Sequence, residues 1–143
     1  MAGDWETLIH LDISNCFNTG NIISPRCSGG IVGTQGAIAK EEWINTKNVY
    51  NIGEVTGKYA GNIIGEILKY ADRRDTKADF QNVYGIKEPF IGNGNLTSGS
   101  GTLKAKNEIC SQAFVDLLNQ NIGSNSDWKK WKLGEKGYPV LDI

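Results

Sequence analysis

Three aromatic residues recur along the chain at nearly constant spacing, and asparagine follows two of them. The aromatic residues are Phe17, Tyr50 and Tyr84, and the asparagines are Asn18 and Asn51. Aromatic faces stack on sugar rings, and an amide both donates hydrogen bonds to hydroxyl groups and accepts them. These five residues are therefore our candidate binding residues for a weak glycan or protein contact, provided that they face solvent. If they face the core, they are packing residues and the chain is a spacer.

Paired carboxylates would indicate cleavage of a polysaccharide, which uses two acidic side chains ~5–10 Å apart. Glu54 and Glu66 are the candidates, and their equivalents one repeat earlier are Asn21 and Thr34. Nothing in the flanking sequence indicates that either glutamate is buried. We therefore assign no catalytic residue and expect the chain not to be an enzyme.

Three further features could bind a metal or an anion. His10 is the single histidine, and no second ligand follows it at a metal-binding spacing. The glycine-rich segment 92–101 lacks the Lys-Ser/Thr of a phosphate-binding loop and indicates a flexible loop. The charged segment 69–79 offers Arg73 and Arg74 to an anion and its aspartates to Ca²⁺, although a solvated, self-compensating loop also accounts for it. We expect no metal and no cofactor.

Charge and composition argue against two classes of partner. The 143 residues carry a net charge of −1, so nothing favours binding to nucleic acid or to an anionic membrane. No apolar run approaches the ~18–20 residues of a membrane span, so we expect no membrane insertion. The first residues lack a signal-peptide pattern. That lack indicates little about the compartment, because we expect the chain to be the C-terminal piece of a longer array.

The three cysteines do not form a closed disulfide framework. Cys16 aligns with Val49 in the second repeat and with Val83 in the third, and Cys110 lies on the apolar face of a predicted helix. Both are expected to be small buried apolar residues. Cys27 lies in a Ser/Gly turn and is expected to be the most exposed of the three.

The chain repeats itself in two ordered half-motifs. NCFNTGNI at 15–22 recurs as NVYNIGEV at 48–55, and SGGIVG at 28–33 recurs as AGNIIG at 60–65. The separation is 33 positions in the first half and 32 in the second. A third copy begins at 81–85 as QNVYG, then departs and does not restore the second half. A fixed period of this length is typical of a stacked array.

The repeated segments are short, contain β-branched and aromatic residues, and are bounded by Gly and Asn. They show no apolar period of 3.6 residues. We therefore predict a mainly β fold, a parallel β-helix (solenoid) of about three coils with strands ~4.8 Å apart. The alternative is an ordinary β-sandwich with a chance duplication.

The repeat also predicts positions within that fold. Asn15, Asn48 and Asn82 should lie at equivalent corners, because asparagine tolerates the left-handed backbone conformation that a sharp corner requires. Their side chains could then form a hydrogen-bonded ladder. The column that contains Cys16 and Val49 should face inward, which would turn the neighbouring aromatic column outward.

The two complete copies resemble the GLUG-motif repeats of bacterial surface and secreted proteins. In that family an Asn-Cys-Tyr-Asn-like stretch and a Gly-Asn-Val-like stretch precede Gly-Gly-Leu/Ile-Val-Gly. The resemblance covers roughly residues 13–85, about half of the chain, with two good copies and one degraded copy. It implies a parallel β-helix and an extracellular or cell-surface location, and it transfers no catalytic residue.

The end of the chain changes character. Cys110, Phe114, Leu117 and Leu118 fall on one face of a helix, so residues 108–120 are predicted to be helical. Asn107 is the expected N-cap, and the glycine at position 123 is the expected stop. Together with a closing strand that contains the proline at 139, this helix should cap the open end of the array.

The predicted organisation therefore has three parts. Residues 1–12 form a partial coil or the edge of a fragment, 13–106 hold the repeats, and 107–143 form the cap. Trp5 and Leu8, the missing repeats, or another copy of the chain should seal the N-terminal edge.

These features favour a non-enzymatic repeat module of the bacterial cell surface or of a secreted protein. Its expected role is an adhesin-like segment or stalk. Its expected partners are a host or cell-surface glycan or protein and further repeats of the same chain. The alternative is a polysaccharide-active β-helix enzyme, a lyase or glycosidase, or an accessory domain of one.

Overall fold

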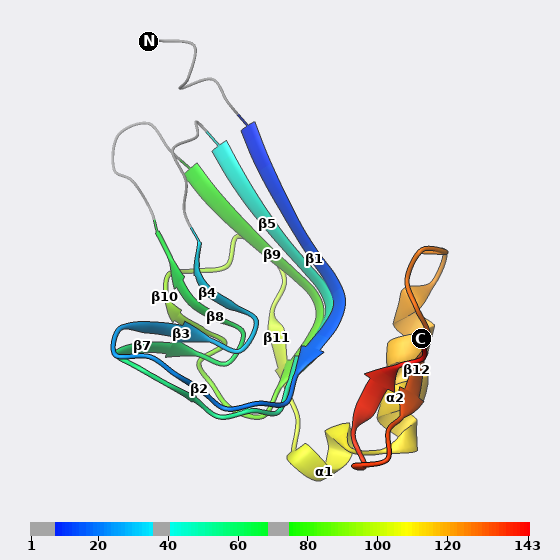
Figure 1. Ribbon diagram of the computed structural model, residues 1–143. Coiled ribbons are helices and arrows are strands. Elements are labelled where there is room, and N and C mark those ends of the chain that lie inside the picture. Colours follow the sequence, from blue (N-terminus) through cyan, green and yellow to red (C-terminus); the bar gives the residue numbers. More distant parts are fainter. Residues whose placement is uncertain (1–7, 36–40, 69–74) are drawn as a thin grey trace.

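A computed structural model describes residues 8–35, 41–68 and 75–143. Within these ranges the protein is mainly β, and three long strands carry the first half-motif of the three sequence copies. They pair in parallel with one shorter strand, so that each copy lies beside the next (Figure 1). The strands of this four-stranded sheet, in spatial order, are β1 (Leu8–Asn18), β5 (Glu41–Asn51), β9 (Asp75–Gly85) and β11 (Gly101–Leu103).

The rest of each copy, from the last residue of the first half-motif onward, forms shorter parallel ladders on one side of the long strands. The pairs are β2 (Ile22–Ile23) with β6 (Val55–Thr56), and β3 (Cys27–Gly29) with β7 (Tyr59–Gly61). A three-stranded sheet joins β4 (Val32–Gln35), β8 (Ile64–Ile67) and β10 (Ile91–Asn93). Glycine is required where these copies meet, since a Cβ on Gly53 would lie 2.0 Å from the backbone oxygen of Gly20.

The predicted parallel β-helix of about three coils is wrong. The described strands instead form five separate sheets, of four, three, two, two and two strands. Two structural features prevent a single continuous ladder. The strands of the second half-motif are only two to four residues long, and sharp bends separate them. The third copy also passes from β9 to β10 without strands equivalent to β6 and β7.

The third copy nevertheless restores part of the half-motif that the sequence reading found missing. Ile91 pairs with Ile64, and Asn93 pairs with Glu66. Phe90-Ile91-Gly92 therefore aligns with Ile63-Ile64-Gly65, and the third copy is shortened rather than lost.

The asparagine prediction is confirmed. Ser14 and Cys16 lie opposite Lys47 and Val49, so Asn15 lies beside Asn48. Asn15, Asn48 and Asn82 are the non-glycine residues with positive φ in the described chain, at 52°, 54° and 57°. The first step of the amide ladder also forms, since Asn48 Nδ2 donates to Asn15 Oδ1 at 2.9 Å.

The inward column is confirmed as well. Val49 and Val83 are fully buried, and Val83 packs in the apolar core with Ile44 and Ile63 between the long strands and the three-stranded sheet. Cys16, in the same column on the edge strand, is half-buried, and this burial raises the pKa of its thiol. The outward face of the sheet therefore carries the aromatic column.

The C-terminal segment covers that aromatic column from the other side of the sheet (Figure 1). Two helices replace the single predicted one. Cys110 and Ser111 separate them, and the Ser111 hydroxyl caps the second by accepting from the N–H of Phe114, so the expected N-cap Asn107 is wrong. The elements of the segment are α1 (Lys106–Ile109), α2 (Gln112–Ile122), β12 (Trp131–Leu133) and β13 (Pro139–Leu141).

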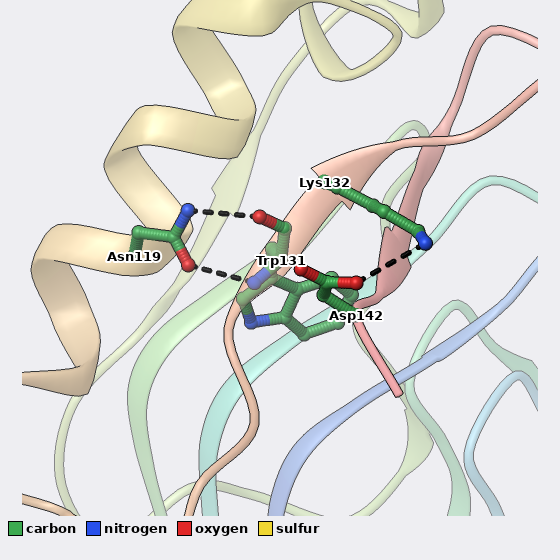
Figure 2. Close-up of polar contacts among 4 residues, drawn as sticks. All are labelled: Asn119, Trp131, Lys132 and Asp142. Carbon is green, nitrogen blue, oxygen red and sulfur yellow. Dashed lines mark hydrogen bonds and ion pairs between the residues drawn. The ribbon is translucent and has the colours of Figure 1, made fainter.

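One side chain of α2 holds the closing strand β12 in place. Asn119 Nδ2 donates to the carbonyl of Trp131 at 3.0 Å, and the N–H of Trp131 donates to Asn119 Oδ1 at 2.7 Å (Figure 2). Lys132 pairs with Asp142 at 3.1 Å on the surface of the antiparallel β12–β13 pair. Gly123, with φ of 56°, ends α2 as expected. Among the described residues, no helix has the length and apolar character needed to cross a membrane.

Candidate functional site

The structure buries the aromatic column that the sequence offered as a binding face. Tyr50 is 0% exposed and Tyr84 is also buried, while Phe17 on the edge strand is half-buried. Phe114 of α2 meets both tyrosine rings edge-on, and the ring of Phe17 stacks on Tyr50 with centroids 5.3 Å apart. The column points outward as predicted, but it does not face solvent, because the C-terminal segment packs on it.

The two asparagines beside the aromatics act within the fold. Asn51 is fully buried, and its Nδ2 donates to the carbonyl of Asn62 at 2.8 Å. Its Oδ1 accepts from Asn18 Nδ2 at 2.9 Å and from the N–H of Gly53. These bonds hold the turn after the second long strand and leave Asn51 inaccessible to a ligand.

The two candidate carboxylates have different environments. Glu54 is exposed, whereas Glu66 is buried, contrary to the sequence reading. Glu66 Oε2 accepts from Asn93 Nδ2 at 2.8 Å, and Oε1 accepts from the Cys27 thiol at 3.4 Å. The bond from Asn93, then that from Cys27 and the charge of Arg26, lower the pKa of the Glu66 carboxyl. A carboxylate held ionised in this way does not serve as a general acid.

Among the described residues, the remaining sequence candidates do not gather as metal ligands. His10 stacks on Trp43 with centroids 5.9 Å apart on the outer face of the long strands. Cys27 is half-buried, as are the other two cysteines, so it is not set apart by exposure. In the described ranges, no three His, Cys, Asp or Glu side chains gather as metal ligands. Trp5, the Leu8 side chain and the Arg73-Arg74 pair lie outside the described structure.

A groove of about 450 Å³ lies beside the short strands of the second copy. We call it the second-copy groove. Apolar side chains line it, together with charged groups at Glu54, Lys87 and Glu88. The lining residues are Gly53, Glu54, Val55, Thr56, Ala60, Gly61, Asn62, Ile86, Lys87, Glu88 and Pro89.

The groove exists because the third copy is short. Thirteen positions separate Asn51 from Ile64 in the second copy, but only six separate their partners Gly85 and Ile91. The first copy shows what a full neighbour does: Ser28 is 1% exposed beneath the second copy, and its hydroxyl donates to the carbonyl of Thr56. Ala60, its partner in the register, lines the groove and is only half-buried.

The open edges of two strands are available to a ligand in the groove. Strands β6 and β7 each have one partner strand in the described chain, so each has an open edge. Asn62 also lines the groove, but its Oδ1 is buried against Gly85, where an added Cβ would lie 1.9 Å from it, so this oxygen is not offered to a ligand.

Sequence reasoning missed this site because it treated the departure after Gly85 as the end of the repeat. The usable signal was Phe90-Ile91-Gly92, which aligns with Ile63-Ile64-Gly65 and shows that residues are missing before it. Comparison of the chain with protein-family models, with curated proteins and with solved structures found no match.

Proposed function

We propose that this chain is a non-enzymatic binding module of a bacterial cell-surface or secreted repeat protein, and that its partner occupies the second-copy groove. The observation that supports this proposal is the groove itself, a concavity of about 450 Å³ with two open strand edges. A mostly apolar concavity with a few polar groups is the usual form of a binding site. The resemblance of the repeats to GLUG motifs supports the extracellular setting.

The buried aromatic column alone would make the chain a spacer, and the groove supplies a contact site in its place. A ligand can reach the aromatic column only if the C-terminal segment leaves it, since Tyr50 lies under Phe114 and its hydroxyl donates to the carbonyl of Pro139. The groove needs no such displacement. Its charged residues Glu54, Lys87 and Glu88 add polar contacts to those of its apolar side chains.

The polysaccharide-active alternative is less well supported. Such an enzyme needs one carboxyl group that stays protonated near neutral pH and a second that is ionised. The pKa of Glu66 is shifted in the opposite direction from that of a general acid, and both of its oxygens accept hydrogen bonds. A glycan or protein partner that is held without turnover fits the groove better.

The test compares ligand binding by the protein and by a variant whose groove is filled. Ala60→Trp places an indole in the groove, and Ala105→Trp is the matched control on the exposed residue that precedes α1. A glycan array and a displayed peptide library would be screened with both. Ligands that bind the protein and the control but not Ala60→Trp would support the proposal. Equal binding by both variants, or cleavage of any glycan, would overturn it.

A further inference from the structure

We propose that the ligand of the second-copy groove is an extended peptide that adds a parallel strand to β6 and β7, an inference that rests on the proposed function. The groove lies where the third copy would place its own short strands. A peptide bound there would supply, from another molecule, the segment that the third copy lacks.

The backbone of β6 presents hydrogen-bonding groups to the groove. On its other edge β6 pairs with β2. There the N–H of Ile22 donates to the backbone carbonyl of Glu54 at 2.8 Å, and the N–H of Ser24 donates to the backbone carbonyl of Thr56 at 3.0 Å. The residues that face β2 are thus Glu54 and Thr56. Successive residues of a strand direct their backbone groups to opposite edges. The N–H and C=O of Val55 therefore point away from β2, toward the groove.

The same alternation applies to β7. The N–H of Tyr59 donates to the carbonyl of Arg26 in the first copy at 2.7 Å. Asn62 has the opposite orientation, since its N–H donates to the carbonyl of Pro89 in the third copy at 2.8 Å. Ala60 has the parity of Asn62, so its backbone groups also face the third-copy side.

The ladders on both sides of the groove already continue into the third copy. The N–H groups of Ile63 and Ile64 both donate to the carbonyl of Phe90 at 3.0 Å, and β9 pairs with β5 along the long strands. An added strand would lie one strand spacing, ~4.8 Å, beyond β6 and in line with these ladders. Strand addition of this kind obtains affinity from main-chain hydrogen bonds and specificity from side-chain pockets.

The groove also indicates the length and chemistry of the peptide. The third copy is shorter than the second by about seven residues between Gly85 and Ile91, so a heptapeptide matches the missing length. Apolar residues should lie beside Val55, and small residues should lie beside Ala60 and Gly61. An acidic residue should lie beside Lys58, because opposite charges directly across a ladder are favourable.

The probe is a capped heptapeptide, Val-Thr-Gly-Glu-Tyr-Ala-Gly, which has the sequence of residues 55–61 with glutamate in place of Lys58. Its control is the same peptide N-methylated at alternate residues, which removes the donors that a strand would use. Both are titrated into the ¹⁵N-labelled protein, and a panel of oligosaccharides is titrated in parallel. We expect the capped heptapeptide to shift the amide protons of Val55 and Ala60 downfield with saturation and to slow their exchange.

Two proline variants test the backbone contact directly. Val55→Pro removes the N–H that faces the groove and leaves the β2–β6 bonds in place. Ile23→Pro is the matched control, because Ile23 alternates with Ile22 and Ser24 and faces away from β6, and its side chain is 82% exposed. We expect at least a tenfold loss of peptide affinity in the first variant and less than a twofold change in the second. Amide spectra confirm that each is folded, and Ala60→Trp serves as the blocking variant if Val55→Pro unfolds.

Three results would overturn the inference. The first is that the N-methylated peptide binds as well as the probe. The second is that Val55→Pro, or Ala60→Trp if Val55→Pro unfolds, binds the probe with normal affinity. The third is that the probe leaves the amide resonances of the groove unshifted up to millimolar concentration. If an oligosaccharide then shifts the groove residues, the inference falls and the proposed function stands. If neither peptides nor oligosaccharides shift them, the proposed function falls too.

Discussion

Asn48 lies where the repeat, the core and the C-terminal segment meet, and its replacement separates two contributions to stability. Its side chain is 1% exposed and makes three hydrogen bonds. It donates to Asn15 Oδ1 at 2.9 Å and to the carbonyl of Leu118 at 3.1 Å, and it accepts from Asn121 Nδ2 at 3.1 Å. Its backbone is left-handed, with φ of 54°.

The expected cost of Asn48→Ala follows from these two features. Each buried hydrogen bond contributes about 1 kcal/mol net. The loss of unfolding free energy is reduced because two of the former partners keep another hydrogen bond. Asn15 Oδ1 still accepts from Trp131 Nε1, and Asn121 Nδ2 still donates to the Tyr84 hydroxyl. Three lost bonds thus cost about 2–3 kcal/mol, and the left-handed backbone costs alanine about 1 kcal/mol more. Asn48→Gly loses the same bonds without the left-handed penalty, so it should be about 1 kcal/mol less destabilising than Asn48→Ala.

Urea unfolding monitored by tryptophan fluorescence measures the difference. With an m-value of about 2 kcal/mol/M, a loss of ~3.5 kcal/mol lowers the midpoint by about 1.7 M. Asn45→Ala is the control, since Asn45 lies on the same strand without positive φ and donates to Asp12 at 3.0 Å, an exposed bond. It should cost less than ~1 kcal/mol. Equal loss in Asn48→Ala and Asn48→Gly would refute the backbone argument, and a loss below ~0.5 kcal/mol in both would refute the ladder.

Three further outcomes are expected. Phe114→Ala should lower the free energy of unfolding by about 3–5 kcal/mol in urea melts, because Phe114 is 3% exposed between two tyrosine rings. The control Leu103→Ala, at an exposed residue, should lower it by under ~0.5 kcal/mol, and equal losses in both variants would contradict a packed C-terminal layer. The pKa of Glu66 is lowered on folding, so its contribution to stability is present above pH ~4.3 and is lost as the pH falls. Glu66→Gln should therefore reduce the loss of stability at acid pH in urea melts, and an unchanged dependence on pH would contradict the lowered pKa. Burial raises the pKa of Tyr50, so stability should fall as the pH rises above ~10, and less steeply in Tyr50→Phe; identical alkaline limbs in pH-dependent urea melts would count against it.

The spacing of identical residue types predicted much of the local structure. Asn15, Asn48 and Asn82 recur because one backbone conformation recurs, and that conformation favours asparagine wherever the chain is folded around it. The inward position of Val49 also followed from pattern, since a strand alternates its side chains between two faces. Phe114 and Leu118 could be placed on the buried face of a helix for the same kind of reason.

Alternation along a strand assigns a side chain to one face of the sheet, but it does not say what packs against that face. Tyr50 was correctly turned away from the inner core, and only the docking of α2 and β12 made it buried rather than exposed. The break between α1 and α2 is local by contrast. The apolar pattern runs through Cys110, but the Ser111 hydroxyl accepts from the N–H of Phe114 and begins a new helix there.

The overall arrangement depended on contacts between copies, which no single copy specifies. Two similar copies indicated parallel pairing, and that pairing formed, but the division into five sheets was decided by strand length and by the residues missing from the third copy. Glu66 is buried because Asn93, 27 positions later, lies beside it across β8 and β10. The second-copy groove likewise belongs to no motif. It is the space beside Val55 and Ala60 that a longer third copy would have filled, so it exists only once the three copies are packed together.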